Sequence, residues 1–372
     1  EAFEISEKFD TPVIVRLTTR VAHSRGLVEL GEKEEVPLRP YEKNPGKYVM
    51  MPAMARKRHI AVEERLADLS GFSDETSLNR IEWGDRKTGV IASGISYQYA
   101  KEALGNASFL KLGMVYPLPE KLIREFAARV EYLYVIEELE PFIEDGCRRM
   151  GLEVKGKELL PVIGEYSATL IRERVLGQKR EKFNSIEENI PARPPVMCPG
   201  CPHRGLFYVL RKLKLTVTGD IGCYTLGAQP PLDSIDTCVC MGASVGMAHG
   251  IEKARGREAA RKTVAVIGDS TFIHSGITGL IDIVYNKGTS TVIILDNSTT
   301  GMTGHQDNPA TGITIRGERT RQVDLVKLCQ AVGVDRVRVC DPFDLDETEK
   351  IIREEVAADE PSVIISQRPC AL

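Results

Sequence analysis

Two short runs of apolar, mostly β-branched residues, 263–267 and 291–295, place the strongest constraint on the fold of this chain. Continuous apolar runs of this length are typical of strands buried on both faces of a helix-covered parallel sheet. The 30 residues from Gly268 to Asn297 correspond to one strand–helix–strand crossover. Further strands are expected at 215–218, 337–339 and 362–365. We therefore predict an α/β fold, with parallel sheets covered by helices on both faces.

The chain divides into segments of different character. Strands expected at 89–93, 109–112 and 132–136 alternate with helices, one of them at 96–104 and another opened by Pro119, which predicts a second α/β domain. An apolar strand at 13–18 followed by polar, Pro-rich sequence is typical of the end of one domain and a linker. The expected organisation is the end of a domain at 1–30, a linker at 31–85, a domain at 86–172, a linker at 173–195 and a domain at 196–372.

Composition excludes several classes of protein. The 372 residues are 42% hydrophobic and 27% charged, with a net charge of −4, so nothing favours nucleic acid as a partner. No apolar run approaches the roughly 18 residues that span a bilayer, so we expect no membrane partner. Nine cysteines without a secretory signal favour reduced thiols or metal ligands and a cytoplasmic location. Because the chain starts within a helical pattern and stops just after an apolar strand, we expect a fragment.

Polar residues follow both of the most constrained strands. Gly268-Asp269-Ser270 ends the first strand, and Asp296-Asn297 ends the next. These residues should meet at the carboxyl edge of the sheet, where open α/β sheets bind ligands. Carboxylate and amide oxygens suit Mg²⁺, and the following helix, with its two glycines, offers amide groups to a phosphate. The alternative is a simple strand-to-helix turn with an N-capping residue.

The cysteines form the second candidate site. Cys198 and Cys201 make a CxxC pair ahead of a helix, and Cys223 follows the next strand. Such a pair is compatible with zinc, a redox dithiol or an iron–sulfur cluster. Cys238 and Cys240 could complete a zinc site in a binding module, or be small buried thiols packed near a cofactor. Three more cysteines are predicted to lie in or near the core: Cys147, Cys329 and Cys340.

Several segments, in this order, resemble one enzyme family. Gly-Asp-Ser followed by Asp-Asn is similar to the Gly-Asp-Gly and Asn-Asn fingerprint of thiamine-diphosphate enzymes, with Ser270 and Asp296 as departures. With the cysteines, the pattern resembles 2-oxoacid:ferredoxin oxidoreductases, and most of all the alpha subunit of the indolepyruvate branch. The resemblance covers essentially the whole chain and is carried by LTTRVAHSRG, CPGCPHRG, GDIGCYTLG, DTCVCMGAS, VIGDSTFIHSGITGL, DNSTTGMTGHQDNP and RPCAL.

The resemblance implies a role for particular residues. It implies a pyrimidine-binding domain ending near residue 30, a transketolase C-terminal-like domain at 86–172 and a thiamine-diphosphate-binding fold at 196–372. Asp269, Asn297 and the Thr299 carbonyl would hold Mg²⁺ and the diphosphate. The other positions expected at the cofactor are Gly222, Cys223, Gly242, Ala243, Ser244, Gly268 and Ser270. Three histidines would either face cofactor and substrate as catalytic groups or only cap backbone: His203, His274 and His305.

The implied reaction is the oxidative decarboxylation of arylpyruvates such as indolepyruvate to aryl-acetyl-coenzyme A, with electrons passing to ferredoxin. A beta subunit would be the partner, and 4Fe-4S clusters would lie mainly in a ferredoxin-like module beyond residue 372. Another 2-oxoacid, or non-oxidative decarboxylation, is the alternative. Cys198, Cys201 and Cys223 either bind a local 4Fe-4S cluster or are reduced and structural. In related oxidoreductases the fourth ligand lies in the region after Asn308, whose thiols are Cys329, Cys340 and Cys370; His203 or Cys240 could substitute.

Overall fold

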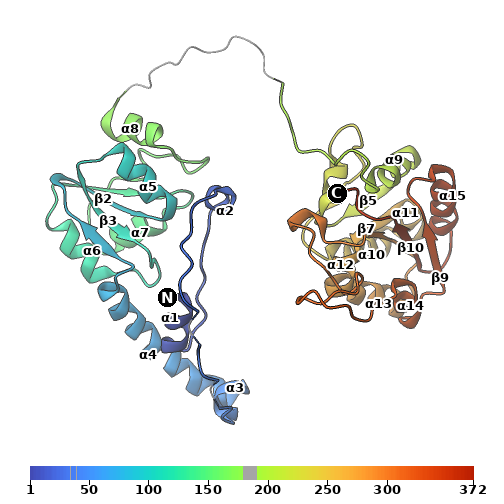
Figure 1. The fold of residues 1–372 in the computed structure, drawn as a ribbon, viewed down its shortest axis with the longest axis horizontal. Helices are drawn as coiled ribbons and strands as arrows, with labels where there is room; N and C mark the ends of the chain where they lie inside the picture. The colour runs from blue at the N-terminus through green and yellow to red at the C-terminus, as the bar shows by residue number, and fades with distance from the viewer. Residues whose placement is uncertain (34, 39, 179–190) are drawn as a thin grey trace. The chain divides into compact units, whose positions relative to one another are not determined.

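The computed structural model describes residues 1–33, 35–38, 40–178 and 191–372. The chain forms two compact units, residues 1–187 and 188–372, each with its own sheet (Figure 1). Most of the segment predicted as a linker at 173–195 lies outside the described residues. No described helix has the length and apolarity needed to cross a membrane.

The C-terminal unit is built on a six-stranded sheet in the order β6-β5-β7-β8-β10-β9. All of its neighbouring strands are parallel, as predicted. The strands are β5 (Thr216–Gly219), β6 (Thr237–Cys238), β7 (Thr263–Gly268), β8 (Thr291–Asp296), β9 (Arg336–Cys340) and β10 (Ser362–Gln367). Every residue of β7 and β8 is buried, which explains their uninterrupted apolar sequence.

Helices cover both faces of this sheet because alternate strand residues point to opposite sides (Figure 1). Val264 and Val266 face a core shared with α9 (His203–Leu213) and α15 (Leu345–Val356). Ala265 and Ile267 face a second core shared with three other helices, α10 (Ala243–Arg255), α13 (Ile277–Tyr285) and α14 (Leu325–Ala331). Short helical segments join these elements: η1 (Cys223–Ala228), α11 (Arg257–Ala260), α12 (Asp269–Thr271), η2 (Phe272–Gly276) and η3 (Gly301–Thr303).

The N-terminal unit contains a four-stranded sheet in the order β1-β3-β2-β4. Its strands are β1 (Arg80–Glu82), β2 (Asp85–Ser93), β3 (Ala107–Leu112) and β4 (Tyr132–Ile136). β1 is antiparallel to β3 and the other pairs are parallel. α5 (Gly94–Ala103) and α8 (Ala168–Leu176) cover one face, while α6 (Glu120–Ala127) and α7 (Phe142–Arg149) cover the other.

The structure differs from the sequence prediction before β1. Residues 13–18 are extended but form no strand, because no described segment pairs with them, and Ile14 is 92% exposed. The segment predicted as a linker at 31–85 contains a 24-residue helix, α4 (Pro52–Glu75), in addition to β1. The remaining helices of this unit are α1 (Ala2–Phe9), α2 (Thr19–His23) and α3 (Pro45–Tyr48).

Candidate functional site

The two predicted polar motifs meet at the carboxyl edge of the C-terminal sheet. β7 and β8 are adjacent, and Gly268 pairs with Leu295, so Asp269, just after β7, and Asp296, the last residue of β8, lie at the same edge of the sheet. Asp269 and Asn297 are both buried there, at 3% and 8% exposure. The helix that starts at Asp269 contains a π-helical segment, η2, a feature frequent at functional sites.

Asp269 is a buried carboxylate with little compensation from protein groups. Its Oδ1 accepts the Ser270 N–H at 2.7 Å, and its Oδ2 accepts only the distant Asn308 amide at 3.5 Å. Burial raises the pKa of Asp269 to about 6. The hydrogen bond from the Ser270 N–H lowers this pKa, and the repulsion of Asp296 raises it. No described lysine or arginine forms an ion pair with Asp269. An uncompensated buried charge favours a cation at this position.

The polar groups next to Asp269 differ in whether they are already hydrogen-bonded. The Asp296 carboxylate is engaged, because it accepts the Ser298 N–H at 3.0 Å and the Gln367 amide at 2.7 Å. No hydrogen bond between described residues engages the side-chain amide of Asn297 or the Thr299 carbonyl. Two candidate oxygen ligands predicted from the sequence are therefore uncommitted.

Asn308 belongs to this site but was not predicted. Its Oδ1 accepts the Ala310 N–H at 2.8 Å, so its amide nitrogen points toward Asp269 and Thr300. It therefore orients the Asp269 carboxylate rather than offering an oxygen to a cation. It lies 39 residues from Asp269 along the chain, and no motif spacing links the two.

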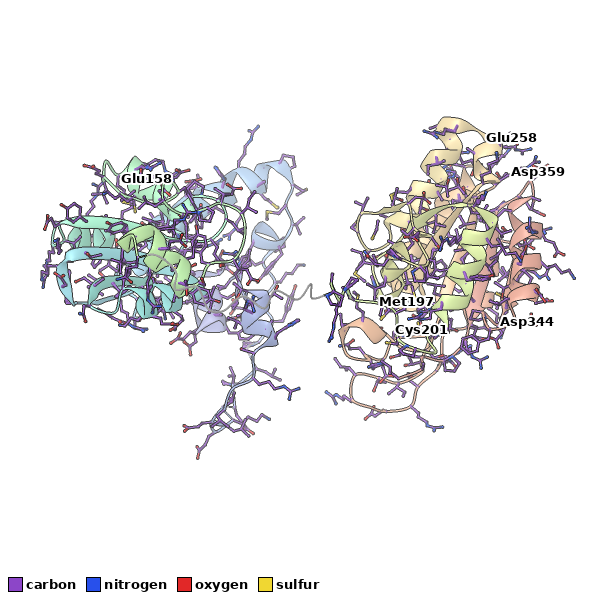
Figure 2. The ribbon with its side chains drawn as sticks, turned by 90° about the horizontal axis from the view of Figure 1, so that it is seen from above. Glu158, Met197, Cys201, Glu258, Asp344 and Asp359 are labelled. Atoms are coloured by element: carbon purple, nitrogen blue, oxygen red, sulfur yellow. The ribbon has the colours of Figure 1, made fainter. Side chains whose placement is uncertain are left out.

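Four cysteines gather beside the turn that precedes α9. Burial raises the pKa of the Cys201 thiol, and the charges of Cys198, Cys223 and Cys370 raise it further. The pKa of Cys223 is raised by burial and then by Cys198 and Cys370. The group lies at the end of the core that contains Met197, which packs near Cys201 (Figure 2). Cys370 was one of three candidate thiols beyond Asn308, and no CxxC partner singled it out in the sequence.

The cysteine group is not arranged to bind a single metal ion as the side chains stand. Tetrahedral Zn²⁺ with Zn–S bonds of about 2.3 Å requires thiolates about 3.8 Å apart. No three His, Cys, Asp or Glu side chains among the described residues come together closely enough to bind one metal ion. In a 4Fe-4S cluster each thiolate binds a different iron, so the thiolates stand farther apart.

The other cysteines lie elsewhere. Cys147, Cys329 and Cys340 are buried in hydrophobic cores, as predicted. The prediction that Cys238 and Cys240 are buried thiols is wrong, because both are exposed. They lie on and just after β6, an edge strand that pairs with β5 on one side only.

The cysteine group lies close to the turns that carry Asp269 and Asn297, called here the cation turn. A Cβ atom placed on Gly301 would lie 3.7 Å from the Cys223 sulfur and 3.8 Å from the Asn297 side-chain nitrogen. In addition, the Cys370 N–H donates to the Asn297 carbonyl at 3.0 Å. The two predicted sites therefore form one continuous region at the carboxyl edge.

The segment Gly242-Ala243-Ser244 also reaches this edge, but its amide groups are occupied. The buried Asp220 carboxylate accepts the N–H groups of Gly242 at 2.8 Å and Ser244 at 3.4 Å. The Ala243 N–H donates to the Cys240 carbonyl. Gly242 has φ +87°, and a Cβ there would lie 2.6 Å from Ser275. The backbone of this segment can approach a cofactor closely, but its N–H groups are not free to donate to it. The Ser244 hydroxyl is buried and has no hydrogen-bond partner among the described residues.

The three histidines lie in different surroundings. His203 is 4% exposed, and burial lowers its pKa to about 4, so it is neutral at physiological pH. His274 is exposed in η2 and contacts the Ser275 hydroxyl at 2.6 Å. His305 is exposed with φ +61°, and its Nε2 is 3.9 Å from the Cys370 sulfur. A catalytic role for each stays a prediction, and burial makes His203 the least suited to exchange protons with solvent.

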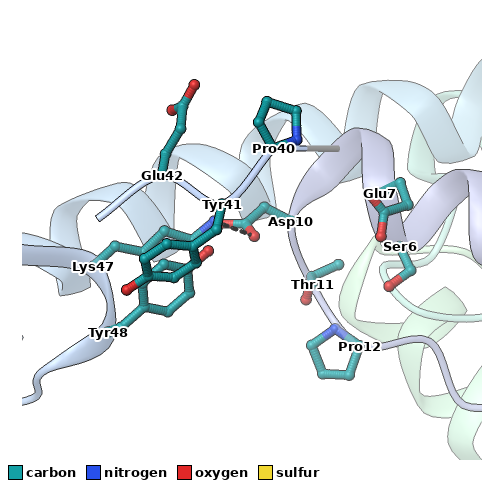
Figure 3. A pocket seen from close by; sticks show the side chains of 10 residues that line it. All are labelled: Ser6, Glu7, Asp10, Thr11, Pro12, Pro40, Tyr41, Glu42, Lys47 and Tyr48. Atoms are coloured by element: carbon teal, nitrogen blue, oxygen red, sulfur yellow. Dashed lines mark hydrogen bonds and ion pairs between the residues drawn. The ribbon is translucent and has the colours of Figure 1, made fainter. Parts of the chain in front are cut away.

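The N-terminal unit contains a hollow of about 870 Å³ between α1 and the chain around α3 (Figure 3). Lys47 closes part of it through an ion pair with Asp10 at 2.6 Å. Its lining includes none of the predicted site residues. The candidate site is therefore the edge of the C-terminal sheet.

Comparison with known proteins agrees with this location. Residues 220–366 match the family "Thiamine pyrophosphate enzyme, C-terminal TPP binding domain". The solved 2-oxoglutarate:ferredoxin oxidoreductase from Magnetococcus marinus is 18% identical, with a TM-score of 0.41, covering 52% of this chain and 72% of that one; a likeness at this level carries no functional argument.

Two relatives match the chain along its whole length. The indolepyruvate oxidoreductase subunit IorA of Archaeoglobus fulgidus is 39% identical, and that of Pyrococcus horikoshii is 38% identical. Each match covers 100% of this chain but only 63% and 64% of the relatives, so the chain spans just under two thirds of their length. Over its whole length the chain is similar to indolepyruvate oxidoreductase IorA subunits, and its residues 220–366 match the C-terminal thiamine-pyrophosphate-binding domain of thiamine pyrophosphate enzymes.

Proposed function

We propose that this chain is the thiamine-diphosphate-binding part of the alpha subunit of an arylpyruvate:ferredoxin oxidoreductase. The enzyme would convert indolepyruvate and related arylpyruvates to aryl-acetyl-coenzyme A and reduce ferredoxin, together with a beta subunit. Nine free cysteines suit a reducing compartment, so we place the enzyme in the cytoplasm. The observation that carries the proposal is the buried, unpaired Asp269 beside uncommitted oxygens and next to a group of thiols.

The residues at the sheet edge fit a Mg²⁺–diphosphate group. Asp269, the Asn297 amide oxygen and the Thr299 carbonyl would hold Mg²⁺, which prefers hard oxygen ligands and completes its coordination with phosphate oxygens. Asn308 would hold the Asp269 carboxylate in place, and Asp296 would hold the chain that follows β8. When bound, thiamine diphosphate supplies the electron sink for decarboxylation, while the protein supplies orientation and electrostatics.

We further propose that Cys198, Cys201, Cys223 and Cys370 bind a 4Fe-4S cluster next to the cofactor. The mutual charge effects among these thiols support the assignment, as does the position of Cys370 in a partly exposed loop. Cys370 replaces His203 and Cys240 as the proposed fourth ligand, since His203 is buried against Tyr224 and Cys240 is exposed at the sheet edge. Such a cluster would accept electrons one at a time from the cofactor region.

Activity of the holoenzyme tests the overall proposal. Indolepyruvate, coenzyme A and a viologen dye are supplied anaerobically, and the products are identified by mass spectrometry. We expect dye reduction that depends on coenzyme A and yields the aryl-acetyl thioester. Aldehyde release without dye reduction would show a non-oxidative decarboxylase instead, and a strong preference for 2-oxoglutarate or pyruvate would contradict the arylpyruvate assignment.

Iron analysis tests the cluster separately. Cys370→Ser should reduce the iron content of the anaerobically purified holoenzyme by about four atoms per chain, because one 4Fe-4S cluster is lost. Cys238→Ser and Cys240→Ser are matched controls, since both thiols are exposed and lie outside the group. Unchanged iron in Cys370→Ser, or stoichiometric zinc in the unaltered protein, would contradict the assignment.

A further inference from the structure

Tyr224 connects the cysteine group to the cation turn. It directly follows Cys223 in η1 and is 5% exposed. Its hydroxyl oxygen accepts the Gly268 N–H at 2.9 Å and donates its proton to the Ile221 carbonyl at 3.1 Å. One phenol therefore joins the loop that carries Cys223 to the residue immediately before Asp269.

The ring of Tyr224 is held between two glycines. A Cβ on Gly222 would lie 2.4 Å from its Cε1, and a Cβ on Gly268 would lie 3.0 Å from the same atom. The edge of the His203 ring packs against it, with centroids 5.9 Å apart and an interplanar angle of 89°. The ring consequently has little freedom to move unless the cysteine loop or the cation turn moves with it.

We propose that Tyr224 is a positioning residue that couples the cysteine group to cofactor binding, an inference that rests on the proposed function. A cluster bound to Cys223 would fix the adjacent Tyr224 ring, and the ring would fix the Gly268 amide and hence the start of α12 at Asp269. By thermodynamic linkage the coupling is reciprocal, so Mg²⁺–thiamine diphosphate favours the conformation that holds the cluster.

Calorimetry on the holoenzyme, stripped of thiamine diphosphate, measures this coupling. Mg²⁺–thiamine diphosphate is titrated into cluster-intact and cluster-depleted samples of the wild type, of Tyr224→Phe, and of Tyr285→Phe. The last is a matched control, because Tyr285 is 83% exposed in α13 of the same unit. Tyr224→Phe keeps the ring and removes one hydrogen-bonding oxygen.

We expect the wild type and Tyr285→Phe to lose about tenfold in affinity on cluster removal, a factor that corresponds to about 1.4 kcal/mol. Tyr224→Phe should bind about tenfold more weakly while the cluster is intact and show no further loss without it. If cluster removal weakened cofactor binding equally in Tyr224→Phe and in the wild type, the proposed coupling would be overturned, while the proposed function would still stand. Absence of Mg²⁺-dependent binding in the wild type would refute the proposed function as well.

A second measurement uses the unaltered protein and therefore does not depend on the folding of a variant. Reciprocal coupling requires Mg²⁺–thiamine diphosphate to slow the loss of iron from the holoenzyme to a chelator, followed by absorbance. An unchanged rate of iron loss would overturn the coupling even if Tyr224→Phe failed to fold.

Discussion

A single carboxylate, Asp269, carries most of the chemical character of the sheet edge. It is 3% exposed, its second oxygen has only a 3.5 Å contact, and Asp296 lies close by. A buried charge without a partner costs stability, so the fold tolerates Asp269 rather than depending on it. A group that lowers stability at the end of a central strand is typical of a binding site.

Replacing Asp269 separates stability from binding. In metal-free protein, Asp269→Asn should raise the free energy of unfolding by about 1–3 kcal/mol, because the unpaired charge is removed. The same variant should lose the stabilisation that Mg²⁺ and thiamine diphosphate give the wild type. Thermal unfolding with and without both ligands measures the two effects. The control is Asp307→Asn, a substitution at an exposed position in the nearby loop. If Mg²⁺ and thiamine diphosphate stabilised Asp269→Asn as much as the wild type, Asp269 would not be a Mg²⁺ ligand.

The sequence was sufficient for some site residues and not for others. Asp269 and Asn297 could be predicted because strand ends in adjacent parallel strands must meet at one edge. Cys370 could not, because its position depends on β10 lying directly beside β8, and strand order is not encoded in local periodicity. Tyr224 looked like an ordinary aromatic residue, since its role arises from the close approach of two glycines distant in the chain.

At the scale of elements, apolar runs rich in β-branched residues predicted eight strands of the two sheets, but they missed the short edge strands β1 and β6 and wrongly predicted a strand at 13–18. A strand exists only as part of a ladder, and sequence alone does not reveal whether a partner is present. The long helix α4 lies in a segment predicted as a linker, because Leu69 and Ser73 are the only buried residues among its 24. Its helical residues lack the apolar stripe on which pattern reading depends.

We predict that alanine substitutions at two helix glycines change the free energy of unfolding in opposite directions. A Cβ on Gly205 of α9 would lie 2.0 Å from the Pro342 carbonyl oxygen, so Gly205→Ala should lower the free energy of unfolding by about 1–3 kcal/mol through overpacking. Gly250 in α10 has open space around it, so Gly250→Ala should raise the free energy by about 0.5–1 kcal/mol through helix propensity. Urea denaturation of both variants measures the difference. Equal midpoints would show that α9 does not press on the chain after β9.

At the scale of the whole chain, the residues of the candidate site belong to one of the two units. All predicted cofactor-binding residues and candidate cluster cysteines fall within residues 196–372, so the C-terminal unit holds the entire candidate site. The N-terminal unit has two cores of its own and contributes none of these residues. Substitutions in its cores are therefore expected to change stability without changing Mg²⁺-dependent cofactor affinity.

The strand order of the C-terminal unit has a consequence for how the protein is made. β10 is the last strand of the unit to leave the ribosome, yet it lies between β8 and β9 in the finished sheet. Until it emerges, β9 has no neighbour, and the apolar edge of β8 is open to water and to other nascent chains. Stalled chains that lack residues 362–372 should be cleaved readily by added protease, while chains that display these residues should resist. Synthesis thus delivers the strand that joins β8 to β9, with Cys370 immediately behind it, only after every other strand of this sheet has been made.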